Sequence, residues 1–196
     1  MRPALSLDID TQKIALLADA FGANIKQMRK AQIRALNKTM KWVRGKAVKA
    51  VAKELEIPQK IARQRVAAFR ASARMPRGKV WSGLQPMKAS RLGKVKQLKR
   101  GGVRAGRHVF DDAFAIQTRG GRYQVFRRTG EPKRETRRGR YAGTGIKREP
   151  VEFVELEWDT AQVLDILDDA YKQAPSRYFE ILRQELKYEV FVKSAR

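Results

Sequence analysis

The stretch LNKTMKWVRGKAVKAVAKELEIPQK, residues 36–60, combines a regular apolar spacing with a high density of lysine. Its apolar residues recur every three or four positions, which is the period of a helix that buries one face. They are Leu36, Met40, Val43, Ala47, Val51 and Leu55. Lysines fill many of the positions between them, and no acidic residue occurs before Glu54. The spacing predicts a long helix with one apolar face and one basic face that repels itself.

The helical pattern extends towards the N-terminus. An earlier apolar stripe consists of Ile14, Leu17, Phe21, Ile25 and Met28. We expect residues 13–55 to form one long helix or two helices in tandem. The two stripes are out of phase between Met28 and Leu36, which indicates either a kink or a change of packing partner near Arg29–Arg34. Ile57-Pro58 predicts the end of this helix and the start of a shorter one, since proline suits a first helical turn. The shorter helix would bury Ile61, Ala62, Val66 and Phe69.

Positive charge is concentrated in the middle of the chain. Residues 25–150 hold 36 Lys/Arg and 7 Asp/Glu, a formal charge of +29, whereas both ends are slightly acidic and the whole chain carries +24. Self-repulsion of this size opposes a compact monomer unless something negative lies opposite it. A phosphate backbone is the first candidate for this counter-charge, and an acidic protein partner is the second.

The composition limits the class of protein. A chain of 196 residues with 42% hydrophobic residues is long enough for one good core or two small ones. The absence of cysteine excludes disulfides, Cys-based zinc sites and thiol nucleophiles, and the single histidine, His108, excludes His-rich metal sites. No apolar run is long enough to span a membrane, and Met1–Asp10 lacks the apolar core of a signal peptide. We expect a protein made and used in a cytoplasm.

From Arg77 onward the pattern changes to short β-type runs. Val80–Leu84 and Pro86–Ser90 are candidate strands flanking a turn, and Lys94–Gly106 reads as a basic, glycine-containing loop. A β-hairpin is predicted near residues 113–128, within Val109–Thr118 and Arg122–Arg128, because apolar residues alternate on both arms. Gly120-Gly121 between the arms would supply the positive φ values of a tight primed turn.

The last third of the chain begins with Thr129–Gly145, which is rich in arginine and glycine and indicates a mobile loop. Val151, Phe153 and Leu156 suggest an extended segment. Two acidic amphipathic helices follow, separated by Pro175. The first contains Val163, Leu164, Ile166, Leu167 and Tyr171, and the second contains Phe179, Leu182, Leu186 and Val190.

These elements predict an α+β fold with a long N-terminal helix, a small antiparallel sheet and C-terminal helices packed on the sheet. We expect a single domain over residues 1–196. Its parts would be a helical part at 1–72, a β-rich part with basic loops at 77–158 and acidic helices at 159–196.

No set of residues suggests catalysis. Asp111-Asp112 follow His108 closely, but no third acidic ligand lies nearby, so a turn is the expected structure and His108 is expected to be structural or on the surface. Gly101-Gly102, Gly106 and Gly120-Gly121 match neither phosphate-loop pattern. We expect neither an enzyme nor a bound metal or cofactor.

The order of segments resembles the minor tail protein Z, or tail completion, family of long-tailed, lambda-like bacteriophages. The first block is RALNKTMKWVRGKAVKAVAKELEIPQKIARQRVAAFR, residues 34–70, with its Ala-Leu-Asn start, basic helix and Glu54–Lys60 step. The second block consists of Gly102–Gly106, Ala113–Ile116, Gly120-Gly121 and Val125–Arg128. The resemblance covers Ala35 to Glu152. It departs from the family at Thr129–Gly145, which is longer and richer in arginine, and at Ile146–Pro150, where the family has a Tyr-Gly-Pro-Ser-like element.

The resemblance implies a structural virion protein at the head-proximal end of the tail, assembled in the host cytoplasm. Such a protein would form a ring, expected to be hexameric, that completes the tail and joins it to the head. Its partners would be its own copies, the tail terminator, the tail tube proteins, the head-tail connector proteins and the genomic DNA in the channel, with no membrane involved. The acidic C-terminal helices could pair with a basic surface of a neighbouring copy.

A basic inner wall could hold the genome end through phosphate contacts without reading sequence. The candidate contact residues occupy two loops and are Lys94, Lys96, Lys99, Arg100, Arg104 and Arg107 in one, and Arg134, Arg137, Arg138 and Arg140 in the other. Contact with an acidic neighbour, or solvation alone, is the alternative role of these residues. The alternative function for the whole chain is a free-standing, sequence-nonspecific nucleic-acid-binding protein.

Overall fold

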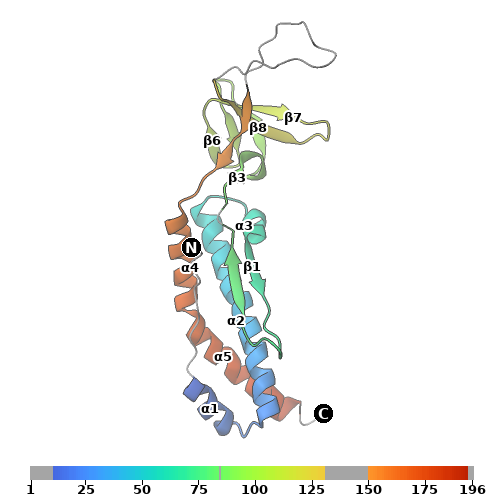
Figure 1. The fold of residues 1–196 in the computed structure, drawn as a ribbon, viewed down its shortest axis with the longest axis vertical. Helices are drawn as coiled ribbons and strands as arrows, with labels where there is room; N and C mark the ends of the chain where they lie inside the picture. Colours follow the sequence, from blue (N-terminus) through green and yellow to red (C-terminus); the bar gives the residue numbers. More distant parts are fainter. Residues whose placement is uncertain (1–10, 84, 131–149, 194–196) are drawn as a thin grey trace. The chain divides into compact units, whose positions relative to one another are not determined.

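The structure, a computed structural model, describes residues 11–83, 85–130 and 150–193. These residues form a mixed fold of helices and small antiparallel sheets, so the expected α+β class is confirmed (Figure 1). They divide into two compact units. Unit 1 takes the described residues of Met1–Leu55, Ala62–Leu84 and Asp159–Arg196, and unit 2 takes those of Glu56–Ile61 and Gln85–Trp158. The single domain expected over the chain stays a prediction.

Unit 1 begins with two helices in tandem, α1 (Thr11–Ala20) and α2 (Ile25–Glu54). Gly22 takes a φ of +62°, which ends α1. Asn24 then caps α2, because its side chain accepts a hydrogen bond from the Gln27 N–H while the Gln27 side chain accepts one from the Asn24 N–H. The tandem arrangement is confirmed, but the break lies at residues 21–24. The predicted kink near Arg29–Arg34 is wrong, because α2 is continuous through it.

The phase change comes instead from a change of packing partner, which was the other expectation. The residues that α2 buries include every fourth position from residue 31, in the row Ala31, Ala35, Thr39, Val43, Ala47 and Val51. Four residues turn about 40° more than one full helical turn, so a row of this spacing winds slowly around a straight helix. Ala31 and Ala35 pack with residues from the body of the second C-terminal helix, while Val43 packs where the two C-terminal helices meet, with Ala170 of the first and Ala174 at the start of the second. The stripe therefore changes partner along α2 and needs no kink.

The C-terminal helices are α4 (Thr160–Lys172) and α5 (Ala174–Lys187), followed by a π-helical turn, η2 (Tyr188–Val192). Pro175 lies in the first turn of α5, so the predicted break is confirmed. Both helices pack chiefly on α2, and Figure 1 shows them running along it. The C-terminal helices were also expected to pack on a sheet. Tyr171 of α4 makes such a contact, because its hydroxyl donates to the carbonyl of Val80, a strand residue, at 3.4 Å.

A two-stranded sheet lies along α2, formed by β1 (Val66–Phe69) and β2 (Lys79–Ser82) (Figure 1). It follows α3 (Gln59–Arg65), so the helix predicted after Pro58 is confirmed only as far as Arg65, and the prediction of helix through Phe69 is wrong. After Arg65 the chain leaves the helical conformation of α3, because side chains of α2 form hydrogen bonds with its backbone. Arg44 Nε donates to the Val66 carbonyl at 2.8 Å, and the Asn37 amide bonds both the N–H and the carbonyl of Ala71.

Two buried glutamates join α5 and η2 to the first half of α2. Glu185 and Glu189 are 5% and 3% exposed. Arg34 pairs with both carboxylates, and Lys38 Nζ lies 2.5 Å from Glu185 Oε1. Because a carboxylate out of water needs a paired cation, this network makes the position of α5 depend on α2.

Replacing Arg34 by methionine should lower the free energy of unfolding by about 2 kcal/mol, because two buried carboxylates lose a shared cation while the apolar stem is kept. Urea titration at pH 7 measures this. The matched control is Arg29→Met, an exposed position on the same helix. Its change should stay within about 0.5 kcal/mol. Equal losses in the two variants would show that the network contributes nothing specific.

Tyr178 of α5 lies in the apolar core with Ala31 and Ala35 of α2 and is 3% exposed. Burial raises the pKa of Tyr178 to about 12, from the ordinary value of about 10. The folded state therefore holds this proton more tightly than the unfolded state does. Stability from this group is complete below pH 10 and is lost as the pH rises towards 12.

Between pH 9 and pH 12 the variant Tyr178→Phe should lose about 2 kcal/mol less stability than the wild type, because it has no phenol at position 178 to ionise on unfolding. Urea titrations at the two pH values measure the difference. Tyr123→Phe, at a position that is 46% exposed, serves as control and should leave the alkaline loss unchanged. An undiminished loss in Tyr178→Phe would contradict the assignment.

Unit 2 is built from short antiparallel strands, with one 3₁₀ turn, η1 (Ala89–Arg91). Its strands are β3 (Met87–Lys88), β4 (Val95–Gln97), β5 (Val103–Ala105), β6 (His108–Phe110), β7 (Ala113–Gln117), β8 (Tyr123–Arg128), β9 (Val151–Phe153) and β10 (Glu155–Leu156). They form a β10–β3 pair, a β4–β5–β6 sheet and a β7–β8–β9 sheet. Gln97 connects the two larger sheets, because its side-chain oxygen accepts from the Ala115 N–H at 2.9 Å.

Three predictions about these strands need correction. Lys94–Gly106 is not a loop but contains the β4–β5 hairpin. The strands expected at residues 80–84 and 86–90 exist as β2 and β3, but β3 ends at Lys88 because η1 begins at Ala89; β2 pairs with β1, and β3 pairs with β10. The hairpin near residues 113–128 is confirmed, but only Gly121 of its two glycines has a positive φ. The Gly121 N–H donates to the Thr118 carbonyl, so the connection is a three-residue turn rather than a primed two-residue turn.

Candidate nucleic-acid interface

The β4–β5 hairpin gathers four of the predicted contact residues. Lys96 and Arg104 lie directly opposite each other in the antiparallel register. Val103 and Ala105, on either side of Arg104, are 0% exposed, so Arg104 and Lys96 occupy the solvent face of the sheet. Like charges directly opposite each other destabilise a strand pair. The fold therefore bears a cost at this position that its own packing does not require.

Lys99 and Arg100 extend the basic surface at the end of the hairpin, where both are exposed. The turn is closed by the Leu98 N–H, which donates to the Gly102 carbonyl at 3.0 Å, and by the Gln97 side chain, which donates to the same oxygen at 2.9 Å. Gly102 has a φ of +78°, and a Cβ there would come within 2.8 Å of the Phe110 carbonyl oxygen. Glycine is therefore required for the turn that presents these two cations.

The other two residues of this set lie where β4 begins and β5 ends. Lys94 is exposed, and its carbonyl accepts from the Gly106 N–H at 3.2 Å. Arg107 Nη1 lies 3.7 Å from Glu56 Oε1, and both side chains are more than half exposed, so this ion pair contributes little stability. Of the six residues, Arg107 is the one with an acidic neighbour recorded among the described residues.

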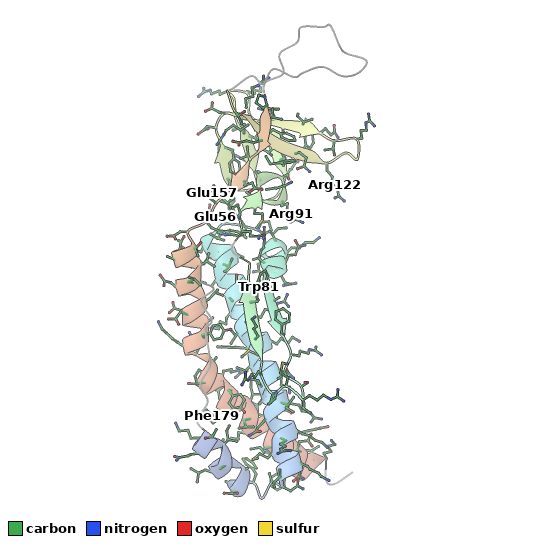
Figure 2. The ribbon with its side chains drawn as sticks, viewed as in Figure 1. Glu56, Trp81, Arg91, Arg122, Glu157 and Phe179 are labelled. Atoms are coloured by element: carbon green, nitrogen blue, oxygen red, sulfur yellow. The ribbon has the colours of Figure 1, made fainter. Side chains whose placement is uncertain are left out.

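Arg134, Arg137, Arg138 and Arg140 lie outside the residues that the structure describes. The structure adds two exposed arginines to the candidates, Arg119 and Arg122, at the turn of the β7–β8 hairpin. Figure 2 shows Arg122 at this turn. The signal was present in the sequence, since both flank the Gly120-Gly121 pair that predicted the turn.

An aromatic row crosses the β7–β8–β9 sheet but does not form an open stacking surface. Phe126 lies between Phe114 and Phe153, with ring centroids 6.1 and 4.9 Å apart. Cations cover the outer rings, because Arg128 Cζ lies 5.6 Å from the Phe114 centroid and Lys88 Nζ lies 3.6 Å from that of Phe153. The ring faces are thus used by cross-strand neighbours and cations, which stabilises the sheet.

The histidine and the acidic pair that the sequence analysis weighed as metal ligands lie on β6 and in the turn that follows it. His108 lies on β6 with its ring 6.3 Å from that of Phe110, and Asp111-Asp112 form a turn in which Asp112 has a φ of +55°. In the part of the chain that the structure covers, no cluster of three or more histidine or acidic side chains could hold a metal. A search of the same residues finds no helix long and apolar enough to cross a membrane.

Residues 23–190 match the family model described as prophage minor tail protein Z (GPZ). The chain belongs to the prophage minor tail protein Z family. Its members are structural phage tail proteins rather than a class of enzyme, and the match runs through both compact units.

A curated relative supports this membership. The chain is 28% identical over 114 residues to a protein of Escherichia phage N15 named "Tail completion protein". The alignment covers 53% of this chain and 62% of the relative, so the chain spans less than two thirds of the relative's length. No solved structure matches the chain significantly.

Lys96→Glu should raise the free energy of unfolding by about 0.5 kcal/mol, because it replaces a like-charge pair with an opposite-charge pair across β4 and β5. Urea titration at low salt measures the change, and added salt should reduce it. Lys94→Glu removes the same charge outside the paired positions and is the matched control. An equal gain in both variants would mean that net charge, and not the cross-strand pair, determines the effect.

Proposed function

We propose that this minor tail protein completes the head-proximal end of a phage tail as a ring, helps to join the tail to the head and accommodates the genome end by phosphate contact. The observation that carries the proposal is the opposed pair Lys96 and Arg104, with Lys99 and Arg100 at the turn of the same hairpin, in a member of a tail protein family. Cations collected on one strand face suit a polyanion that is held by charge and not by sequence.

The distribution of acidic residues supports an external counter-charge. The acidic C-terminal helices were expected to pair with a neighbouring copy, but Glu185 and Glu189 pair with Arg34 and Lys38 of their own chain. Lys172 likewise lies 2.9 Å from Asp168 in its own helix. Much of the acidic charge is therefore used internally. No ion pair within the described residues involves Lys96, Lys99, Arg100 or Arg104, so we assign these cations to a partner outside the chain.

Exposed apolar residues of unit 1 support contact with another protein. Leu16, Ile25 and Phe191 are 69%, 67% and 58% exposed. A surface cavity of about 500 Å³ lies between α1 and α5, lined in part by Leu16, Leu17 and Phe179. Figure 2 shows Phe179 on the side of α5 that faces α1. We assign this apolar surface to contact between copies in the proposed ring, because apolar area drives such association whereas exposed lysine does not.

The proposed neighbours are the tail terminator, the tail tube proteins and the head-tail connector proteins, with genomic DNA in the channel. The proposed location is the head-proximal end of the tail in the virion, after assembly in the host cytoplasm. The alternative, a free-standing nucleic-acid-binding protein, predicts that the chain stays out of virions. Labelling of the protein in electron micrographs separates the two, because label at the neck supports the tail role and its absence from particles contradicts it.

The double reversal Lys96→Glu with Arg104→Glu tests the genome part of the proposal. The two glutamates would face each other as the two cations do now, so the fold should keep its present stability while the face changes sign. Phage carrying the variant should form tails of normal length, yet infectious titre should fall at least about tenfold because joining or DNA delivery fails. Lys26→Glu with Lys30→Glu, at exposed positions of α2, is the control. Full infectivity of the hairpin variant would refute the role of this face.

A further inference from the structure

A second basic surface runs along α2, on the side opposite its buried row. Lys41, Gly45, Lys49 and Lys53 are all exposed and recur every fourth position. Each lies two residues before a position of the apolar row Val43, Ala47, Val51 and Leu55. Two residues turn a helix by about 200°, so this row, here called the lysine ridge, forms the outer edge of α2.

The lysine ridge has no acidic partner among the described residues. Arg34 and Lys38, in the first half of α2, pair with Glu185 and Glu189, and Arg44 donates to the carbonyls of Val66 and Arg63. Glu54, the one acidic residue of α2, accepts a hydrogen bond from the Gln162 side chain. Internal contacts thus account for Arg34, Lys38 and Arg44, whereas Lys41, Lys49 and Lys53 have no ion pair to the rest of the described chain.

Gly45 is unexplained by the packing of its own chain. Glycine in the interior of a helix is destabilising relative to alanine, so it calls for a reason. A Cβ at Gly45 would meet no atom within 4 Å, and its φ is not in the positive region. Neither crowding nor backbone conformation inside unit 1 requires glycine here. A partner that approaches the α2 backbone closely between Lys41 and Lys49 would require it.

The chemistry of the ridge selects the kind of partner. The ridge offers no apolar anchor, and lysine is depleted in protein–protein interfaces, so an acidic protein fits it poorly. Binding of single-stranded nucleic acid uses exposed aromatic rings. The nearest aromatic residue, Trp42, is half-buried, and Lys46 Nζ lies 5.3 Å from its ring centroid. Lys41 to Lys53 spans about 18 Å of helix, along which duplex DNA presents about ten phosphate charges.

We propose that the lysine ridge binds the phosphate backbone of double-stranded DNA, with Gly45 allowing a strand to approach the α2 backbone. This deepens the proposed function and rests on it, because the ridge becomes a second phosphate contact besides the β4–β5 hairpin. The ridge carries three cations in one row on a single rigid helix, so its contribution to binding should be separable from the general charge of the chain.

The test measures binding of the full-length chain to a short DNA duplex of arbitrary sequence across a salt series. Lys41→Gln, Lys49→Gln and Lys53→Gln together should lower affinity at least about tenfold at low salt. They should also reduce the slope of log affinity against log salt by roughly 3, since each lost phosphate contact removes about 0.9. The control is Lys26→Gln, Arg29→Gln and Lys30→Gln, which removes the same charge from exposed positions of the same helix. Its slope should change by less than about 1.

A second variant leaves the charge unchanged. Gly45→Leu adds a side chain to open space on a helix, so the fold should be retained, as a thermal unfolding curve would verify. It should lower affinity for the duplex several-fold by holding the strand away from the backbone. General electrostatic attraction would leave the affinity of this variant equal to that of the wild type.

Three outcomes overturn the inference. Equal effects of the two triple variants would mean that net charge alone drives binding. Undiminished duplex binding by the ridge variant would mean that the ridge does not contact DNA. This would leave the proposed function intact. Failure of the wild-type chain to bind duplex DNA at any salt would overturn both the ridge and the genome part of the proposed function.

Discussion

Packing on a single winding row of α2 is the constraint on which unit 1 depends. The side chains of this row at 31, 35 and 47 are alanines and therefore small. Thr39 is also buried there, and its hydroxyl is satisfied because it donates to the Ala35 carbonyl at 2.9 Å. Small residues allow neighbouring backbones to come close, so α5 can pack along the first half of the helix and α4 can follow. The row winds around α2 from its N-terminal to its C-terminal half. The two shorter helices α4 and α5, which are consecutive in the chain, can therefore both pack on α2.

The same row determines where charge can reside. Arg34 and Lys38 lie beside the row in the first half of α2, and they pair with two glutamates of α5 and η2 that have little contact with water. Lys41, Lys49 and Lys53 lie opposite the row and face solvent, and within the described residues they have no acidic partner. Pairing with buried glutamates at Arg34 and Lys38, and exposure at Lys41, Lys49 and Lys53, divide the charge of α2 into a part that stabilises the fold and a part that is available to a partner.

Unit 2 presents cations by a different geometry. In short antiparallel strands, alternate residues point to opposite faces, so one small apolar face can be buried while the other carries lysine and arginine. The tight turn that requires Gly102 then presents two more cations, Lys99 and Arg100, at the end of the β4–β5 hairpin. The proposed function uses this separation, because apolar surface would serve assembly while basic surface would hold a polyanion.

The amino-acid sequence alone determined the class and order of elements, because these depend on local periodicity. The helical spacing of α2, the break at Pro58, the strand alternation around Gly120-Gly121 and the helix start at Pro175 are each encoded within a few residues. The family was also recognisable at this level, since it is carried by an ordered set of short segments. The basic character of residues 94–107 could be read directly, and the lysines and arginines of this segment are exposed.

Only the tertiary structure decided which of these residues meet. Val66–Phe69 has apolar residues that suit a helix, but side chains of Asn37 and Arg44, more than twenty positions away, bind the backbone of this segment and of Ala71 and favour a strand. The opposed Lys96 and Arg104 depend on strand register, and the unmatched lysine ridge depends on where α5 places its glutamates. Long-range pairing and burial are set by contacts between distant parts of the chain, and local spacing does not contain that information.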